Sequence, residues 1–229
     1  MQNHHRSEMI LAVVLASAAG FVDAVGFIHL GGYFVSFMSG NSTRGGTALA
    51  EGNWSGFAIA FGLVAAFLTG VVSAAILRRF VRSHKRMAVL LYVTAALTSA
   101  VVLFDLGIGG WLAPAIMALA MGAENVIFER DGEVSIGLTY MTGTLVKMGQ
   151  HIANALTGGQ KTLWVRYLAL WIALTSGSII GGFSYFAMNL NALWIAVGVL
   201  VLSVFFNSWL RTRPARRGAV RVALEGTAR

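Results

Sequence analysis

The chain has 229 residues, of which 57% are hydrophobic and 11% are charged, and its formal net charge is +8. Soluble domains usually contain about 25% charged residues, so this composition excludes an ordinary water-soluble protein. The lack of cysteine excludes disulfides, iron–sulfur clusters and thiol catalysis. A strong positive charge would suggest nucleic acid for a soluble protein, but in a membrane protein it is tested first against the positive-inside rule.

Six apolar stretches predict transmembrane helices, because a hydrocarbon core of about 30 Å needs about 20 apolar residues in a helix. The predicted spans are residues 9–28, 55–77, 87–106, 110–128, 164–187 and 192–210. Helices are expected because lipid cannot satisfy an open backbone, and the strict alternation of a β-barrel is absent. The predicted fold class is an all-α integral membrane protein with a single membrane domain over residues 1–229.

The first span has an alternative interpretation as a secretory signal peptide. It follows Arg6 and contains the small residues 16–18. The stretch is long for the apolar region of a signal peptide, and a similar segment recurs later in the chain. We therefore favour a transmembrane span.

Basic residues predict the orientation of the spans. Dense basic clusters lie at 78–86 and after residue 210, and a sparser group lies at 129–163. The connections at 107–109 and 188–191 carry no charge. With both termini in the cytoplasm, every dense cluster falls on the cytoplasmic side, so the net charge needs no nucleic-acid partner. The basic tail 211–229 serves as a topology signal in this interpretation, and contact with anionic lipid headgroups is a second role for it.

The chain contains an internal repeat. Residues 37–46 (FMSGNSTRGG) align with residues 140–149 (YMTGTLVKMG) at a constant offset of 103. Upstream, Asp23 aligns with Asn125. The repeats, about 8–107 and 110–210, hold three spans each. Because three is odd, the second repeat must enter the membrane from the opposite side, which predicts a 3+3 inverted-topology repeat of the kind found in transporters. A relic of duplication without functional meaning is the alternative.

The repeated motif predicts a broken or re-entrant segment in each half, near 31–46 and 137–149. These stretches are too polar to span the membrane and too apolar for exposed loops. Ser39 or Thr142 is expected to cap the helix that follows. Two helix N-termini would approach the midplane from opposite sides, with Arg44 and Lys147 one turn further along. Helix N-termini and a nearby cation favour an anionic group.

A substrate-binding site is predicted between the two repeats, because a charged residue within the membrane marks a pathway or a partner. Asp23 is the strongest candidate: it would pair with Arg44 or Lys147, or carry a coupling proton or ion. The alternative is a structural hydrogen bond near the end of the span. Glu124 is a weaker candidate, because it could simply face the interface with Glu129. The predicted site comprises Asp23, Ser39, Gly40, Asn41, Arg44, Asn125, Thr142, Gly143 and Lys147.

The sequence therefore favours a small-solute transporter or channel-like carrier for an anionic or zwitterionic solute. It lacks a phosphate-binding Gly-Lys-Ser/Thr loop, a His-Glu-x-x-His zinc motif and a Gly-x-Ser-x-Gly elbow. We therefore expect no enzyme activity, no metal and no cofactor, and a monomer or homodimer that contacts membrane lipids. The alternatives are a non-transporting scaffold or sensor that binds another membrane protein, and, more weakly, an intramembrane enzyme that uses Asp23 or Glu124.

Two motifs of the first half resemble a known family. The stretch 20–24 (GFVDA), followed by Met38-Ser39-Gly40-Asn41, is similar to the YoaK-like family of bacterial inner-membrane proteins. The resemblance covers residues from about 8 to 210 and implies a multi-pass protein of the bacterial inner membrane. It implies no particular substrate. The second half departs from the motif at Thr144, where the first half has Asn41.

Overall fold

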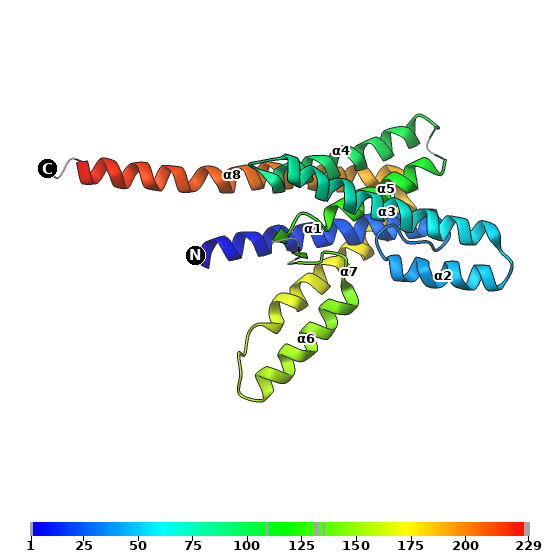
Figure 1. The fold of residues 1–229 in the computed structure, drawn as a ribbon, viewed down its shortest axis with the longest axis horizontal. Coiled ribbons are helices and arrows are strands. Elements are labelled where there is room, and N and C mark those ends of the chain that lie inside the picture. Colours follow the sequence, from blue (N-terminus) through cyan, green and yellow to red (C-terminus); the bar gives the residue numbers. More distant parts are fainter. Residues whose placement is uncertain (1, 109, 131–132, 135, 227–229) are drawn as a thin grey trace.

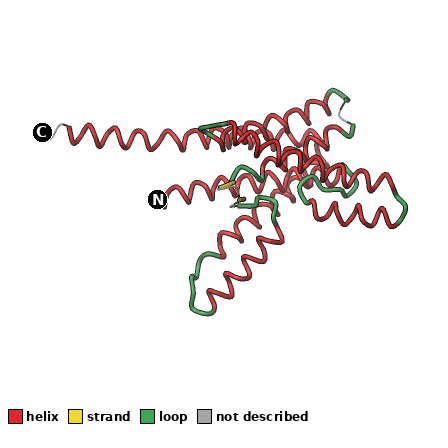
Figure 2. The backbone as a smooth tube through the Cα atoms, in the orientation of Figure 1, coloured by secondary structure: helices red, strands yellow, loops and turns green. Residues whose placement is uncertain are grey.

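The computed structural model describes residues 2–108, 110–130, 133–134 and 136–226, and for 2–6, 130, 133–134 and 210–226 it describes the backbone alone. The described residues form eight α-helices, one 3-10 helix and one antiparallel pair of short strands (Figures 1 and 2). The elements are α1 (Gln2–His29), α2 (Met38–Ala50), α3 (Trp54–Phe80), α4 (Lys85–Asp105), α5 (Leu112–Glu124), β1 (Glu129–Arg130), β2 (Glu133–Val134), α6 (Met141–Leu156), α7 (Trp164–Met188), η1 (Asn189–Ala192) and α8 (Leu193–Gly226).

Several of these helices are long and apolar enough to cross a membrane. Within the described residues, four such segments are Ser7–His29, Trp54–Phe80, Lys85–Asp105 and Trp164–Trp209. The last segment contains both α7 and the first part of α8, which η1 separates. The predicted all-α membrane fold is therefore confirmed at this level. The β1–β2 pair, in which Glu129 lies opposite Val134, is a small addition that the sequence analysis did not predict.

The helix predicted over 110–128 is shorter in the structure. Helix α5 has 13 residues and ends at Glu124, and the chain continues in turns to Phe128. Val126, Ile127 and Phe128 are nevertheless buried. The apolar run was therefore a correct sign of burial, but it does not continue as a helix.

Each motif begins a separate short helix, as expected for a broken segment. Helix α1 ends where Gly31 and Gly32 adopt positive φ angles of 65° and 102°, which glycine tolerates without steric cost. The prediction that Ser39 or Thr142 caps its helix is wrong. The N-cap residues of α2 and α6 are Phe37 and Tyr140, two residues before the predicted ones, and neither makes a side-chain cap hydrogen bond. Ser39 and Thr142 therefore lie inside the first turn.

The helices of the two halves exchange partners. Helix α1 packs on α7, and α5 packs on α3. The two halves contain their helices in the same order, so α5 is the counterpart of α1, and α7 is the counterpart of α3. The first helix of each half therefore lies against the third helix of the other half. The short helices behave alike: α2 packs on α3, and α6 packs on α7. In Figure 1 the α2–α3 hairpin reaches to the right of the view, the α6–α7 hairpin reaches to the lower left, and both termini lie on the left.

Matched glycines allow these helix pairs to cross in backbone contact. A Cβ atom at Gly177 would overlap the carbonyl oxygen of Ser17, and one at Gly70 would overlap that of Leu119. Leu119 lies 102 residues after Ser17, and Gly177 lies 107 residues after Gly70. A second matched pair of contacts joins Gly20 with Leu174, and Gly122 with Phe67. Both pairs of contacts have the same two separations, 102 residues between α1 and α5 and 107 residues between α3 and α7, so both halves use the same small-residue crossing.

The tail predicted as a basic cytoplasmic segment, 211–229, falls largely outside what the structure describes. Helix α8 continues as backbone to Gly226, residues 227–229 lie outside the described residues, and no side chain of 210–229 is described.

Gly70→Ala and Gly177→Ala should both destabilise the fold, because each new methyl group would force two backbones apart. Overpacking of this kind costs about 1–3 kcal/mol. The matched controls are Gly62→Ala in α3 and Gly198→Ala in α8, where a Cβ would meet nothing within 4 Å. The controls should be neutral or more stable, since alanine favours helix over glycine by up to about 1 kcal/mol. Thermal unfolding in detergent measures all four variants, and equal melting temperatures for variants and controls would contradict the crossing.

Candidate functional site

Asp23 holds the irregular segment that follows α1. Its Oδ1 atom accepts hydrogen bonds from the backbone N–H groups of Val35, at 2.9 Å, and Ser36, at 2.7 Å. The carboxyl group of Asp23 therefore fixes the loop against α1 just before α2 begins, and the structural alternative for this residue describes its role in this conformation.

Asn41 satisfies the same loop from the other side. Its side chain is 0% exposed. The Oδ1 atom accepts a hydrogen bond from the N–H group of Phe34 at 2.9 Å, and Nδ2 donates one to the carbonyl oxygen of Phe34 at 2.7 Å. The amide group of Asn41 thus makes the two hydrogen bonds that a neighbouring β-strand would make to the backbone of Phe34. Together with Asp23, it allows non-helical backbone to lie within the protein without unsatisfied polar groups.

The second half repeats this arrangement with neutral groups. Asn125, the counterpart of Asp23, accepts hydrogen bonds through Oδ1 from the Oγ1 atom of Thr139, at 3.2 Å, and from its N–H group, at 3.4 Å. Its Nδ2 atom donates to the carbonyl oxygen of Met121 at 3.0 Å. Thr139 lies 103 residues after Ser36, so helix and loop are joined at equivalent positions. Thr144, which replaces Asn41, is buried.

The remaining predicted site residues lie on the short helices. Arg44 places its guanidinium carbon 4.6 Å from the ring centroid of Tyr33, a cation–π contact. Gly40 is half-buried. The exposed residues of this group are Ser39, Arg44, Thr142, Gly143 and Lys147.

The structure brings the nine predicted residues together in two groups rather than one. Asp23, Asn41 and the start of α2 form the first group, and Asn125 with the start of α6 forms the second. Within the described residues, α2 packs on α3 and α6 packs on α7, and α2 and α6 do not contact each other. In this conformation the two repeated motifs therefore lie apart.

Glu124 is a candidate that sequence reasoning undervalued. The expectation that it faces the interface with Glu129 is wrong, because its side chain is 0% exposed. Neither carboxyl oxygen of Glu124 has a hydrogen-bond partner among the described residues. The repeat contains the signal that could have identified it: the equivalent position in the first half, 102 residues earlier, is the apolar Val22.

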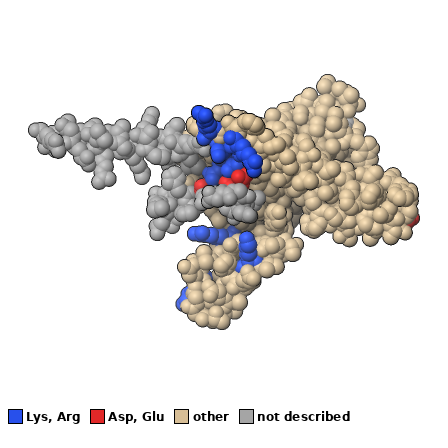
Figure 3. Space-filling view, in the orientation of Figure 1, with Lys and Arg blue, Asp and Glu red and all other residues tan. Residues whose placement is uncertain are grey.

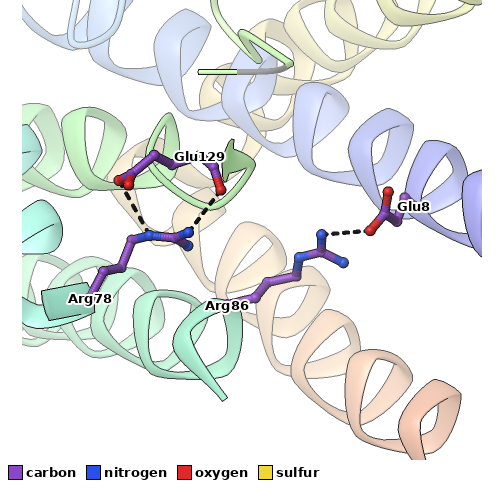
Figure 4. A network of polar contacts seen from close by, with 4 residues as sticks. All are labelled: Glu8, Arg78, Arg86 and Glu129. Atoms are coloured by element: carbon purple, nitrogen blue, oxygen red, sulfur yellow. Dashed lines mark hydrogen bonds and ion pairs between the residues drawn. The ribbon is translucent and has the colours of Figure 1, made fainter. Parts of the chain in front are cut away.

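Two ion pairs lie toward the end of the molecule where both termini are found (Figures 3 and 4). Arg78 of α3 places Nε 3.3 Å from Oε2 of Glu129 and donates from Nη2 to the backbone oxygen of Glu129 at 2.8 Å. Arg86 of α4 pairs with Glu8 of α1 at 2.9 Å and lies over the ring of Phe128 at 5.1 Å. These pairs tie α1, α3 and α4 to the segment after α5. Two arginines of the cluster at 78–86 therefore also have structural roles.

The described residues contain no group of three or more His, Cys, Asp or Glu side chains placed to hold a metal ion. The polar chemistry of the molecule is that of isolated carboxyl and amide groups within an apolar bundle.

Comparisons with known proteins place this chain among membrane proteins. The family described as "Protein of unknown function (DUF1275)" matches residues 11–206. A UPF0700 transmembrane protein of Rhizobium meliloti (strain 1021) is 33% identical over 193 residues, which covers 83% of this chain and 82% of the relative. No solved structure matches. These matches confirm the resemblance to the YoaK-like family.

Asp23→Ala should destabilise the protein and expose the loop, because it leaves the N–H groups of Val35 and Ser36 without an acceptor. An unsatisfied buried donor costs about 1–3 kcal/mol. Asp23→Asn keeps an acceptor oxygen and should lose less. Thermal unfolding in detergent gives the stability, and hydrogen exchange followed by mass spectrometry gives the protection of residues 30–37. Unchanged exchange in Asp23→Ala would mean that the carboxyl group does not hold the loop.

Proposed function

This chain belongs to the DUF1275 family, and we propose that it works as a small-solute carrier, or a channel-like carrier, with its site between two inverted repeats. In this arrangement six helices cross the membrane, namely α1, α3, α4, α5, α7 and α8, and α2 and α6 are re-entrant helices. A duplication that kept only its sequence pattern would not need to preserve contacts. The observation that carries the proposal is that both halves keep the same contacts at equivalent positions.

The exchanged helix pairs support an inverted arrangement. Each pair joins the first helix of one repeat to the third helix of the other, through Gly20 and Gly177 in one pair and Gly122 and Gly70 in the other. Inverted repeats of transporters place their substrate sites at the interface of the repeats, near discontinuous helices. Exchange of partners means that one repeat can move against the other only by shifting both crossings together, which suits two alternating conformations.

The breaks between α1 and α2 and between α5 and α6, whose backbone groups are hydrogen-bonded by side chains, support a polar path for the solute. Irregular backbone at membrane depth is tolerated where protein or a water-filled cavity satisfies it. Asp23 and Asn41 do this in the first half, and Asn125 does it in the second. Such breaks cost stability without benefit in a purely structural bundle, whereas transporters use them to bind solutes.

The chemistry around the breaks favours an anionic or zwitterionic solute. The N-termini of α2 and α6 carry partial positive charge, and Arg44 and Lys147 lie within two turns of them on exposed faces. Arg44 is held over Tyr33 and keeps its charge available, because a cation–π contact does not neutralise it. Ser39 and Gly40 in the first group, and Thr142 and Gly143 in the second, would contribute hydroxyl and backbone groups. Asp23 would bind the positive group of a zwitterion or a coupling ion.

The location that fits these features is the bacterial inner membrane with both termini in the cytoplasm. In Figure 3 the basic side chains in view gather toward the end where the termini lie, and the opposite part of that face shows none. This is the distribution that the positive-inside rule describes. A monomer contains both repeats, and a homodimer would contain two such sites.

Opposite labelling of the two hairpin tips would test the inverted topology. The chain has no cysteine, so single cysteines can be introduced without background. Glu51→Cys at the α2–α3 tip should react with a membrane-impermeant thiol reagent from the periplasm. Gln160→Cys at the α6–α7 tip should react only from the cytoplasm, as should the control Ser83→Cys between α3 and α4. Labelling of both tips from one side would exclude the inverted repeat.

Reconstituted protein should exchange anionic or zwitterionic solutes across liposome membranes. A panel of radiolabelled organic acids and amino acids would identify the class. Arg44→Ala and Lys147→Ala should each reduce exchange about tenfold or more, since a hydrogen bond to a charged group is worth about 1.5–3 kcal/mol. The exposed Arg79→Ala and Lys161→Ala are the matched controls and should retain exchange. A folded protein that transports no member of the panel would favour a scaffold or sensor instead.

A further inference from the structure

Glu124 has an environment that no other described acidic residue shares. It is the last residue of α5 and is wholly buried, and neither carboxyl oxygen accepts a hydrogen bond from a described residue. A buried carboxylate without a partner is strongly disfavoured relative to its neutral, protonated form. In this conformation the carboxyl group is therefore neutral, and it keeps a proton away from water.

The fold does not require an acid at this position. Asp23 holds a loop, and Glu8 and Glu129 each pair with an arginine. Glu124 does none of this, and Val22 occupies the equivalent position in the first half, fully buried. An apolar side chain would satisfy packing at least as well, so the acid has a role that packing does not explain.

The charged groups on the elements packed against α5 are occupied elsewhere. Helix α5 packs on α3, α4 and α1. The partly buried groups on these helices have partners of their own: Arg78 with Glu129, Arg86 with Glu8, Tyr92 with Ser73, Asp23 with Val35 and Ser36, and His29 with Tyr185. The other charged groups of these helices whose side chains the structure describes, Arg79, Lys85 and Asp105, are exposed. No described cation therefore neutralises Glu124 in this conformation.

We propose that Glu124 is the proton-binding group that couples solute transport to a proton gradient, an inference that rests on the proposed function. Its carboxyl group holds the proton while it is buried. When the segment after α5 moves and water reaches Glu124, an O–H bond breaks, the proton passes to water and the carboxylate remains. The return step takes a proton from water on the other side of the membrane. No redox partner is needed.

The two ion pairs provide the cover that such a cycle requires. Phe128 follows Glu124 by one turn, is buried, and carries Arg86 on its ring, while Arg78 holds the next residue, Glu129. Release of these pairs would free the segment 125–129 and open the end of α5. The same step would leave Arg78 or Arg86 free to stabilise the ionised Glu124, so opening and proton release would occur together.

Infrared spectroscopy of the purified protein tests the proton site without any transport. The carbonyl stretch of a neutral carboxyl group that lacks hydrogen bonds should be present in the wild type and should disappear as the pH is raised. Glu124→Gln should lack this band, and Glu124→Met provides a second variant should the glutamine variant fold poorly. The exposed Glu51→Gln is the matched control and should keep the band. If the carbonyl band of a carboxyl group without hydrogen bonds still titrates after Glu124 is replaced, the proposal is overturned. It is also overturned if the Glu124 band persists at every pH at which the protein stays folded.

Liposomes test the coupling. A pH gradient should drive solute accumulation by the wild type, whereas Glu124→Gln should exchange solute but no longer accumulate it. If the pH gradient affects solute movement equally in the wild type and in Glu124→Gln, the coupling role of Glu124 is overturned, but the proposal that the protein is a carrier is not. A titrating Glu124 band in a wild type that moves no solute would instead overturn the carrier, and the two failures are thus distinguishable.

Discussion

The structure depends on one constraint, the need to satisfy every backbone N–H and C=O group that lies away from water. The helices meet it internally, but each half contains a break where they do not. At these breaks, side chains form the hydrogen bonds instead: the carboxyl group of Asp23 and the amide of Asn41 in the first half, and the amide of Asn125 in the second. Asp23, Asn41 and Asn125 are therefore first of all partners for the backbone, and any role in solute binding is additional.

The same constraint explains why the two halves interlock. A short helix that follows a break has little surface to bury, so α2 and α6 each pack on the third helix of their own half. That leaves the first helices, α1 and α5, to pack on the third helices of the opposite halves. Gly177 and Gly70 permit this by allowing backbone contact with Ser17 and Leu119. Neither half could be removed without exposing the first helix of the other.

The sequence was sufficient to predict the repeated pattern, because apolar length, glycine spacing and a constant offset are all local signals. The helices that follow the breaks begin close to the predicted positions, although Phe37 and Tyr140, rather than Ser39 and Thr142, precede them. The environment of Glu124 could not be predicted in the same way. Its position at the end of an apolar stretch is typical of a residue at the membrane interface, and its burial results from α3 and α4 packing around α5, which no local pattern records.

The differences between the halves matter as much as the symmetry. At the loop-holding position the first half has the acid Asp23 and the second half the amide Asn125, and one residue earlier the second half has Glu124 against Val22. Each half thus has one acid at these two positions, but only that of the first half has hydrogen-bond partners among the described residues. An acid that must remain bound to its loop is poorly suited to exchange protons, since protonation would weaken the bonds it accepts. An acid without partners loses nothing of this kind when it is protonated. In the proposed function, loop stability and proton exchange therefore belong to different carboxyl groups, one in each half.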